Sequence, residues 1–225
     1  MIPRRLEPEI MDTLTEAVDY DTMDHSEVNR RFVYDLLAAA PPSGPILDLG
    51  TGTAQIPIEL ARQRPSARIV AVDASRHMLR VADQNVRRAG LGDRIELQQV
   101  DAKRLPYPDG SFTTVMSNSI VHHVPHPEEV VNEAWRVAAP GGLLFVRDLA
   151  RPDDDPTVAR LVETYAGAAN PHQQKMFGDS LRAALTVDEM STLVVRLGAD
   201  RATVTMTSDR HWTWVARKPG HTTDY

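Results

Sequence analysis

The sequence predicts an α/β fold in which a seven-stranded, mostly parallel sheet is covered by helices on both faces. Short apolar runs alternate with helix-compatible segments between residues 46 and 149. Alternation at this spacing is typical of βαβ units, whose right-handed crossovers build a parallel sheet. A glycine-rich turn follows the first apolar run, and acidic residues lie at the ends of the first three. We therefore expect a ligand site at the carboxyl ends of the strands.

The expected elements follow in order along the chain. Residues 1–40 are polar and expected to be helical, and the proline-rich segment 41–45 should end any helix before the first strand. The expected strands cover residues 46–50, 68–73, 94–100, 113–118, 142–149, 201–207 and 210–216. The expected helices that follow them cover residues 54–63, 75–89, 127–138 and 187–197. Trp212 and Trp214 alternate along the last strand and should share one buried face.

Composition limits the class of protein and the kinds of site. With 225 residues, 42% hydrophobic and 25% charged, the chain has the composition of an ordinary soluble domain with one substantial core. The absence of cysteine excludes disulfides, thiolate metal sites and a cysteine nucleophile. A net charge of −6 argues against a broad nucleic-acid-binding face. No apolar run is long enough to span a bilayer and no signal-peptide pattern is visible, so we expect a cytoplasmic protein.

The most informative stretch is residues 46–54, Ile-Leu-Asp-Leu-Gly-Thr-Gly-Thr-Ala. Gly50 and Gly52 lie between a strand and a helix, where glycine lets the backbone turn sharply and approach a nucleotide-like cofactor. Asp48 suits a cofactor that carries an ammonium group, or it holds the loop by accepting hydrogen bonds from nearby backbone N–H groups. Gln55 stands where a dinucleotide-binding fingerprint has Gly or Ala, which disfavours a dinucleotide.

Two further acids end the second and third apolar runs. Asp73 lies 21 residues after Gly52, the distance at which an acid on the second strand accepts both ribose hydroxyls of a cofactor. Dinucleotide and other nucleoside cofactors share this contact, so Asp73 indicates a ribose without identifying the cofactor. The alternative is that Asp73 caps the helix that opens near Ser75. Asp101, at the end of the third run, is the better discriminator.

Six segments, in this order and spacing, resemble the class I S-adenosylmethionine-dependent methyltransferases, and among them the ubiquinone/menaquinone C-methyltransferase group. They are residues 48–54, 72–79, 101–102, 105–112, 121–125 and 136–143. The resemblance covers about residues 15–150. It implies a Rossmann-like fold that binds S-adenosylmethionine and transfers its methyl group to a small organic acceptor.

The resemblance also implies a set of cofactor-binding residues. They are Tyr20, Asp48, Gly50, Gly52, Thr53, Asp73, Ala74, Met78, Asp101, Ala102 and Asn118. In this family the acid after the third strand binds the adenine amino group, and the next residue, Ala102, offers its backbone N–H to the ring. Met78 would pack on the adenine and Asn118 would lie near the methionine portion. Tyr20 would contact the methionine carboxylate or, as an alternative, pack between helix and sheet.

His122 and His123 follow the fourth expected strand, beside the expected methyl group. A general base is required only if the acceptor is a neutral hydroxyl or a carbon acid, and one of these histidines is then the candidate catalytic residue. The alternative is that positioning and exclusion of water drive the transfer, with the histidines shaping the pocket wall. Neighbouring side chains point apart, so we expect no metal site, even with His126 and Asp148 included.

The resemblance divides the chain into two parts. Residues 1–45 form an amino-terminal helical lid and linker, and residues 46–225 form the methyltransferase core, with a substrate-side insertion at about 152–185. Two other functions stay open: a noncatalytic S-adenosylmethionine-binding protein, and a nicotinamide-dependent oxidoreductase on a Rossmann-like fold. We expect a small-molecule acceptor as partner and no nucleic acid, and the sequence does not indicate an oligomeric state.

Overall fold

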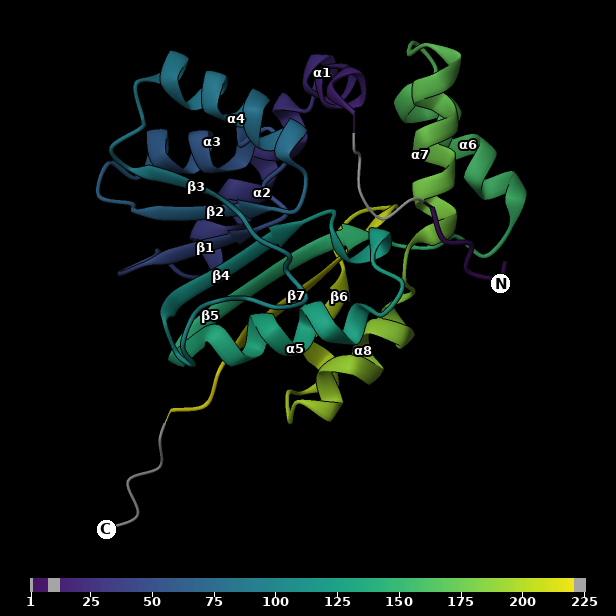
Figure 1. Ribbon diagram of the computed structural model, residues 1–225. Helices are drawn as coiled ribbons and strands as arrows, with labels where there is room; N and C mark the ends of the chain where they lie inside the picture. Colours follow the sequence, from purple (N-terminus) through teal and green to yellow (C-terminus); the bar gives the residue numbers. More distant parts are fainter. Residues whose placement is uncertain (1, 8–12, 221–225) are drawn as a thin grey trace.

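The computed structural model describes residues 2–7 and 13–220 (Figure 1). Seven strands form one sheet in the order β3-β2-β1-β4-β5-β7-β6. Their bounds are β1 Ile46–Leu49, β2 Ile69–Asp73, β3 Ile95–Gln99, β4 Phe112–Asn118, β5 Ala138–Leu149, β6 Val204–Met206 and β7 His211–Arg217. β7 runs antiparallel to β5 and β6, and the other neighbours are parallel. The predicted seven-stranded, mostly parallel sheet is confirmed.

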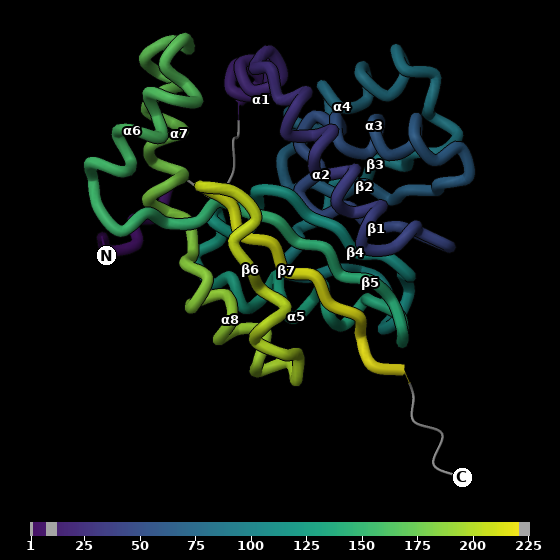
Figure 2. The backbone as a smooth tube through the Cα atoms, turned by 180° about the vertical axis from the view of Figure 1, so that it is seen from behind, coloured from purple at the N-terminus to yellow at the C-terminus, as the bar shows by residue number. Residues whose placement is uncertain are grey.

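Helices cover both faces of the sheet, as Figures 1 and 2 show. α2, α3 and α4 bury apolar side chains against one face, and α5 and α8 against the other. α1, α6 and α7 lie beyond the carboxyl edge of the parallel strands (Figure 1). The helix bounds are α1 Leu14–Thr22, α2 Ser26–Ala39, α3 Gln55–Gln63, α4 Arg76–Ala89, α5 Pro127–Val137, α6 Asp155–Ala166, α7 Pro171–Ala183 and α8 Val187–Arg196. Two 3₁₀ turns complete the set, η1 Val121–His123 and η2 Arg201–Thr203.

Helix α4 illustrates how the local sequence determines an element. Met78, Val81 and Val86 are buried and recur at helical spacing, so one face of the helix packs inward. The Ser75 hydroxyl caps the start by accepting the Met78 N–H, and Gly90 ends the helix in the left-handed conformation with φ 68°. Start and stop lie where the sequence predicts them.

The tryptophans of β7 anchor the other face of the sheet. Trp212 and Trp214 are both fully buried in the cluster formed with α5 and α8, so the predicted shared face is confirmed. Trp212 Nε1 donates to the Leu185 carbonyl at 3.2 Å, and Trp214 stacks on Trp135 with ring centroids 6.0 Å apart.

The chain changes direction across the sheet between β1 and β4, because β2 and β3 lie on one side of β1 and β4 and β5 on the other. Ligands of open α/β sheets bind at such a switch point. Both loops there contain left-handed backbone, at Gly50, Gly52, Ala54 and Ser119, with φ between 55° and 67°. A Cβ at Gly50 would lie 2.7 Å from Ile120 Cδ1, so only glycine fits between the two loops.

Helix α1 is held over the switch point by α3 and α4. Its buried Ala17 packs with Met78 and Val81 of α4. The Asp21 carboxylate accepts hydrogen bonds from Gln55 Nε2 at 3.1 Å and from Asn85 Nδ2 at 2.8 Å. α1 therefore covers the carboxyl ends of β1 and β2. Within the described residues, no helix has the length and apolar character needed to cross a bilayer.

Candidate cofactor and acceptor site

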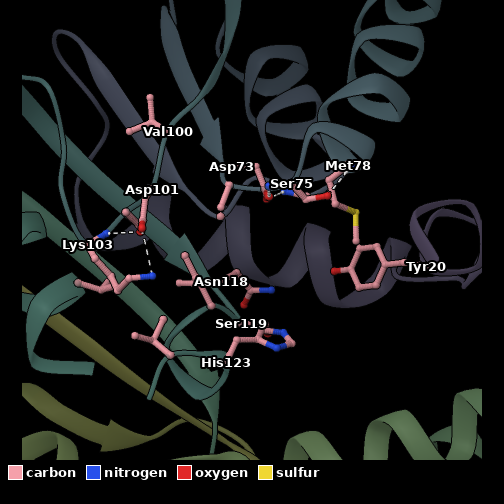
Figure 3. Close-up of a pocket in the computed structure, with 17 residues that line it drawn as sticks. Tyr20, Asp73, Ser75, Met78, Val100, Asp101, Lys103, Asn118, Ser119 and His123 are labelled. Carbon is pink, nitrogen blue, oxygen red and sulfur yellow. Dashed lines mark hydrogen bonds and ion pairs between the residues drawn. The ribbon is translucent and has the colours of Figure 1, made fainter. Parts of the chain in front are cut away.

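An open cavity lies at the switch point (Figure 3). Its walls come from α1, the loops after β1, β2 and β4, the segment after β3, and α5. The predicted site residues that line it are Tyr20, Gly50, Gly52, Asp73, Ala74, Met78, Asp101, Ala102, Asn118 and His123. The cavity has the position of a ligand site in an open α/β sheet.

Three predicted site residues lie behind this wall. Asp48, Thr53 and His122 are buried, with 3%, 1% and 3% of their surface exposed, and none of them lines the cavity. Any effect that they have on a bound molecule passes through the loops that they support.

Asp73 joins two loops of the cavity. Its Oδ2 accepts the Gly52 N–H and its Oδ1 accepts the Ser75 N–H, both at 2.8 Å. Burial raises the pKa of the Asp73 carboxyl, although these backbone hydrogen bonds oppose the rise. The cap of α4 is Ser75 and not Asp73. Each Asp73 oxygen keeps a further lone pair, which a ribose hydroxyl can use.

The Asp48 carboxyl is the strongly perturbed acid of the site. Burial raises its pKa to about 7, the charge of Asp73 adds to this effect, and the Thr51 hydroxyl acts against it. A positive charge brought into the cavity would favour the ionised form of Asp48.

Tyr20 closes the cavity from above the glycine loop. A Cβ added at Gly52 would lie 3.7 Å from Tyr20 Cε1, so the ring covers the loop. Figure 3 shows the ring beside Met78, with its hydroxyl directed into the cavity. Burial, followed by the charges of nearby acids, raises the pKa of Tyr20 to about 12, so the hydroxyl is a neutral donor at physiological pH.

The end of the cavity below β3 contains a cation that the sequence analysis missed. Lys103 lines the cavity, and its Nζ lies 3.1 Å from Asp101 Oδ2. The Lys103 N–H also donates to Asp101 Oδ1 at 2.9 Å (Figure 3). These contacts fix the orientation of Asp101. Lys103 directly follows the predicted pair Asp101 and Ala102, which is the signal that could have identified it.

Another part of the cavity wall combines one amide with apolar side chains. Asn118 Oδ1 is buried and has no hydrogen-bond partner among the residues that the structure describes. Ile120, Val124 and Val130 line the wall beside it. An unsatisfied buried acceptor is costly, so a donor from a bound molecule fits here. Val130 lies on α5, and no local signal in the sequence connects it to this cavity.

His122 and His123 lie side by side on η1, with ring centroids 4.1 Å apart. His122 Nε2 lies 3.4 Å and His123 Nδ1 3.1 Å from the same Oε1 atom of Glu7. The expectation that the two side chains point apart is therefore wrong. The direction of the Cα–Cβ bond does not determine the position of the ring nitrogen atoms, and both imidazoles contact the Glu7 carboxylate. Only His123 lines the cavity.

Behind this pair, Asp148 of β5 holds His122. Asp148 Oδ1 lies 2.5 Å from His122 Nδ1, and Oδ2 accepts the His122 backbone N–H at 3.1 Å. Burial alone would lower the pKa of the His122 imidazole, but the Asp148 carboxylate raises it above its ordinary value. Burial opposes ionisation of Asp148, yet the neighbouring His122 holds the pKa of this carboxyl below its usual range.

Residues 2–7 form part of this side of the site, beside α7 (Figure 1). Arg4 donates to the carbonyl oxygens of His122 at 3.2 Å and Val124 at 2.9 Å. Glu7 Oε1 accepts from the Ser180 hydroxyl of α7 at 3.0 Å. No local pattern in the sequence predicts these contacts, because they join segments more than 100 residues apart.

Comparisons with known proteins agree with this geometry. A family model described as a methyltransferase domain matches residues 47–146. The ubiquinone/menaquinone biosynthesis C-methyltransferase of Ectopseudomonas mendocina (strain ymp) is 26% identical over 185 residues, covering 77% of this chain and 72% of the relative. The demethylmenaquinone methyltransferase of Lactobacillus johnsonii is 36% identical over 107 residues, covering 47% and 44%.

The solved structures support the fold. The crystal structure of a SAM dependent methyltransferase from Aquifex aeolicus superposes with a TM-score of 0.68 at 18% identity, covering 91% of this chain and 98% of that one. Residues 47–146 thus match a methyltransferase-domain model, and the whole chain has a fold that a SAM dependent methyltransferase shares. In sequence the chain is similar to the ubiquinone/menaquinone C-methyltransferases. A nicotinamide-dependent oxidoreductase and a noncatalytic binding protein are not favoured.

Proposed function

We propose that this methyltransferase acts on a small organic acceptor that binds between the cofactor and the wall formed by Ile120, His123 and Val124. The proposal rests on the division of the cavity into a polar surface and a largely apolar wall. Acids and backbone amides lie at the ends of β2 and β3, whereas the wall after β4 is largely apolar. A cofactor with a polar nucleoside needs the first surface, and a small, largely apolar acceptor fits the second.

The residues of the cavity fit S-adenosylmethionine. Asp73 would accept the ribose hydroxyls, and Asp101 with the Ala102 backbone would bind adenine. Tyr20 and Asn118 lie where the methionine portion is expected, and the unpartnered Asn118 Oδ1 would accept from its ammonium group. When bound, this cofactor supplies an electrophilic methyl group attached to a sulfonium.

The residues of the chain itself position the acceptor and exclude water from the cavity. α1 and Tyr20 cover the cofactor side, and the apolar wall excludes water from the acceptor side. Because the methyl donor is already reactive, alignment of the acceptor atom supplies most of what the protein must add. If the acceptor has to lose a proton, His123 is better placed than His122, since only His123 faces the cavity.

Calorimetry with the wild-type chain tests the cofactor assignment. We expect S-adenosylhomocysteine and S-adenosylmethionine to bind more tightly than NAD, because the acids after β2 and β3 fit one adenosine and Gln55 replaces the small residue of a dinucleotide fingerprint. Tighter binding of NAD than of S-adenosylhomocysteine would overturn the proposal.

The role of His123 can be tested once an acceptor is found by screening small phenols and quinols for release of S-adenosylhomocysteine. If positioning drives the transfer, His123→Gln should keep turnover within about tenfold of wild type, because glutamine preserves a polar wall of similar size. A general base would contribute about 10²–10⁴-fold. A loss of that size, with unchanged affinity for S-adenosylhomocysteine, would assign the base to His123.

The acceptor, the methylated atom and the cellular location belong to the proposal. A cytoplasmic location is the prediction from composition. Cell fractionation with an antibody against the chain would check it, and recovery outside the cytosolic fraction would contradict it.

A further inference from the structure

Glu7, His122 and His123 bring three ligand atoms together from two distant segments. Glu7 Oε1, His122 Nε2 and His123 Nδ1 all lie within 4.8 Å of one another. Glu7 and His123 are half-buried, and His122 is buried. His123 belongs both to the cluster and to the lining of the cavity, where Figure 3 shows it.

The hydrogen bonds around the cluster leave lone pairs on the ring nitrogen atoms of His122 and His123 that face Glu7. Asp148 Oδ1 accepts from His122 Nδ1, so a neutral His122 presents a lone pair on Nε2 towards Glu7. His123 Nδ1 is buried and makes no aligned hydrogen bond with any residue in the described ranges, although Glu7 Oε1 is 3.1 Å away. Acceptor atoms at such distances repel one another unless a proton or a metal ion lies between them.

Two of the three distances between the ligand atoms match a metal site. At bond lengths of about 2.0–2.1 Å, neighbouring ligands lie about 2.9 Å apart in octahedral coordination and about 3.4 Å apart in tetrahedral coordination. The Glu7 Oε1 atom lies 3.1 Å from His123 Nδ1 and 3.4 Å from His122 Nε2. Two imidazoles and one carboxylate favour zinc and its neighbours over magnesium or calcium.

Two of the three candidate ligands, His122 and Glu7, have support of the kind that metal ligands need. A histidine ligand almost always donates its other ring N–H to a carboxylate or carbonyl, and Asp148 provides this for His122. Ser180 donates to Glu7 Oε1 and, at 3.2 Å, to Oε2. Arg4, through the His122 and Val124 carbonyls, fixes the segment that contributes Glu7.

We propose that Glu7, His122 and His123 bind one divalent transition-metal ion, zinc by preference, which attaches the amino-terminal segment to the acceptor wall of the cavity. The ion takes the place of the protons that the Glu7 carboxylate and the two imidazoles otherwise share. The sequence predicts no metal site, because neighbouring side chains are expected to point apart and no motif connects Glu7, at the other end of the chain, to η1.

Zinc titration of the untagged, chelator-treated chain tests the proposal by calorimetry, and cobalt provides a visible absorption signal. We expect one ion per chain. Glu7→Gln and His123→Gln should each weaken zinc binding by at least tenfold, because each removes one of three protein ligands. His126→Gln is the matched control: His126 is exposed, lies in the same loop and is outside the cluster.

The outcomes separate clearly. Stoichiometric zinc binding that Glu7→Gln and His123→Gln weaken and His126→Gln does not would support the site. Absence of stoichiometric binding to the wild-type chain, or equal binding by all three variants, would overturn the proposal and assign the cluster to shared protons. Thermal melting of the metal-free proteins checks that each variant is folded, and if one is not, the other ligand variant decides. The titration needs no acceptor or cofactor, so its result is independent of the proposed acceptor.

Discussion

Replacement of Asp73 by alanine should weaken binding of S-adenosylhomocysteine by about a hundredfold or more. Each charge-assisted hydrogen bond to a ribose hydroxyl is expected to contribute about 1.5–3 kcal/mol, and the proposal assigns two to this carboxylate. Calorimetry of the variant against wild type measures the change. Asp93→Ala, which removes an exposed acid, controls for the loss of charge.

The same variant should remain folded but melt at a lower temperature. The Gly52 and Ser75 N–H groups both donate to Asp73, and its loss leaves these part-buried donors without their acceptor. Such a loss costs about 1–3 kcal/mol for each donor that water cannot reach. Wild-type affinity in a less stable protein would make Asp73 a loop support without a role in ribose binding.

Replacement of Asp48 by asparagine should stabilise the cofactor-free protein above neutral pH. The pKa of Asp48 is raised from 3.8 to about 7 in the folded chain, chiefly by burial. A carboxyl whose pKa is higher in the folded state than in the unfolded state contributes stability that is fully present below its unfolded-state pKa. This stability is lost as pH rises through its folded-state pKa. Asparagine cannot ionise, so the variant avoids this loss.

The size of the gain follows from the shift. One pKa unit corresponds to about 1.4 kcal/mol, so we expect Asp48→Asn to be more stable than wild type by about 2–4 kcal/mol above pH 7. The difference should shrink between pH 7 and pH 4 and level off below pH 4. Urea unfolding of both proteins at several pH values measures it, with Asp93→Asn as the exposed control. A difference that does not depend on pH would contradict the assignment.

The elements that the sequence predicts best are those whose signals are local. The cap at Ser75 and the stop at Gly90 define α4 to within a residue, since both act within one turn of the helix. The predicted strand 201–207 is shorter, because the Asp200 carboxylate accepts the Ala202 N–H and folds residues 201–203 into η2. A local hydrogen bond from a side chain competes here with the hydrogen bonds of the sheet, and the pattern of apolar residues in the sequence does not reveal this competition.

The residues of the candidate site likewise separate into those that local patterns predict and those that depend on the tertiary structure. Gly50, Asp73 and Asn118 follow strands, and the carboxyl ends of neighbouring parallel strands meet, so the strand pattern alone brings them together. Glu7 could not be found by that argument, because residues 2–7 reach the site by packing on α7 and η1. Asp48 illustrates a third case: the sequence identifies the residue, but its raised pKa depends on burial that only the tertiary structure shows.

The position of β7 has a consequence for the order in which the chain can fold during translation. β7 lies between β5 and β6 in the sheet, yet it is the last strand to leave the ribosome. Until residues 211–217 emerge, β5 has an unpaired edge, and the face that α5 and α8 cover lacks Trp212 and Trp214. Unpaired edges and exposed apolar faces favour aggregation. The sheet of the nascent chain therefore stays incomplete until β7 has emerged, and a chaperone would be of most use to the chain before that point.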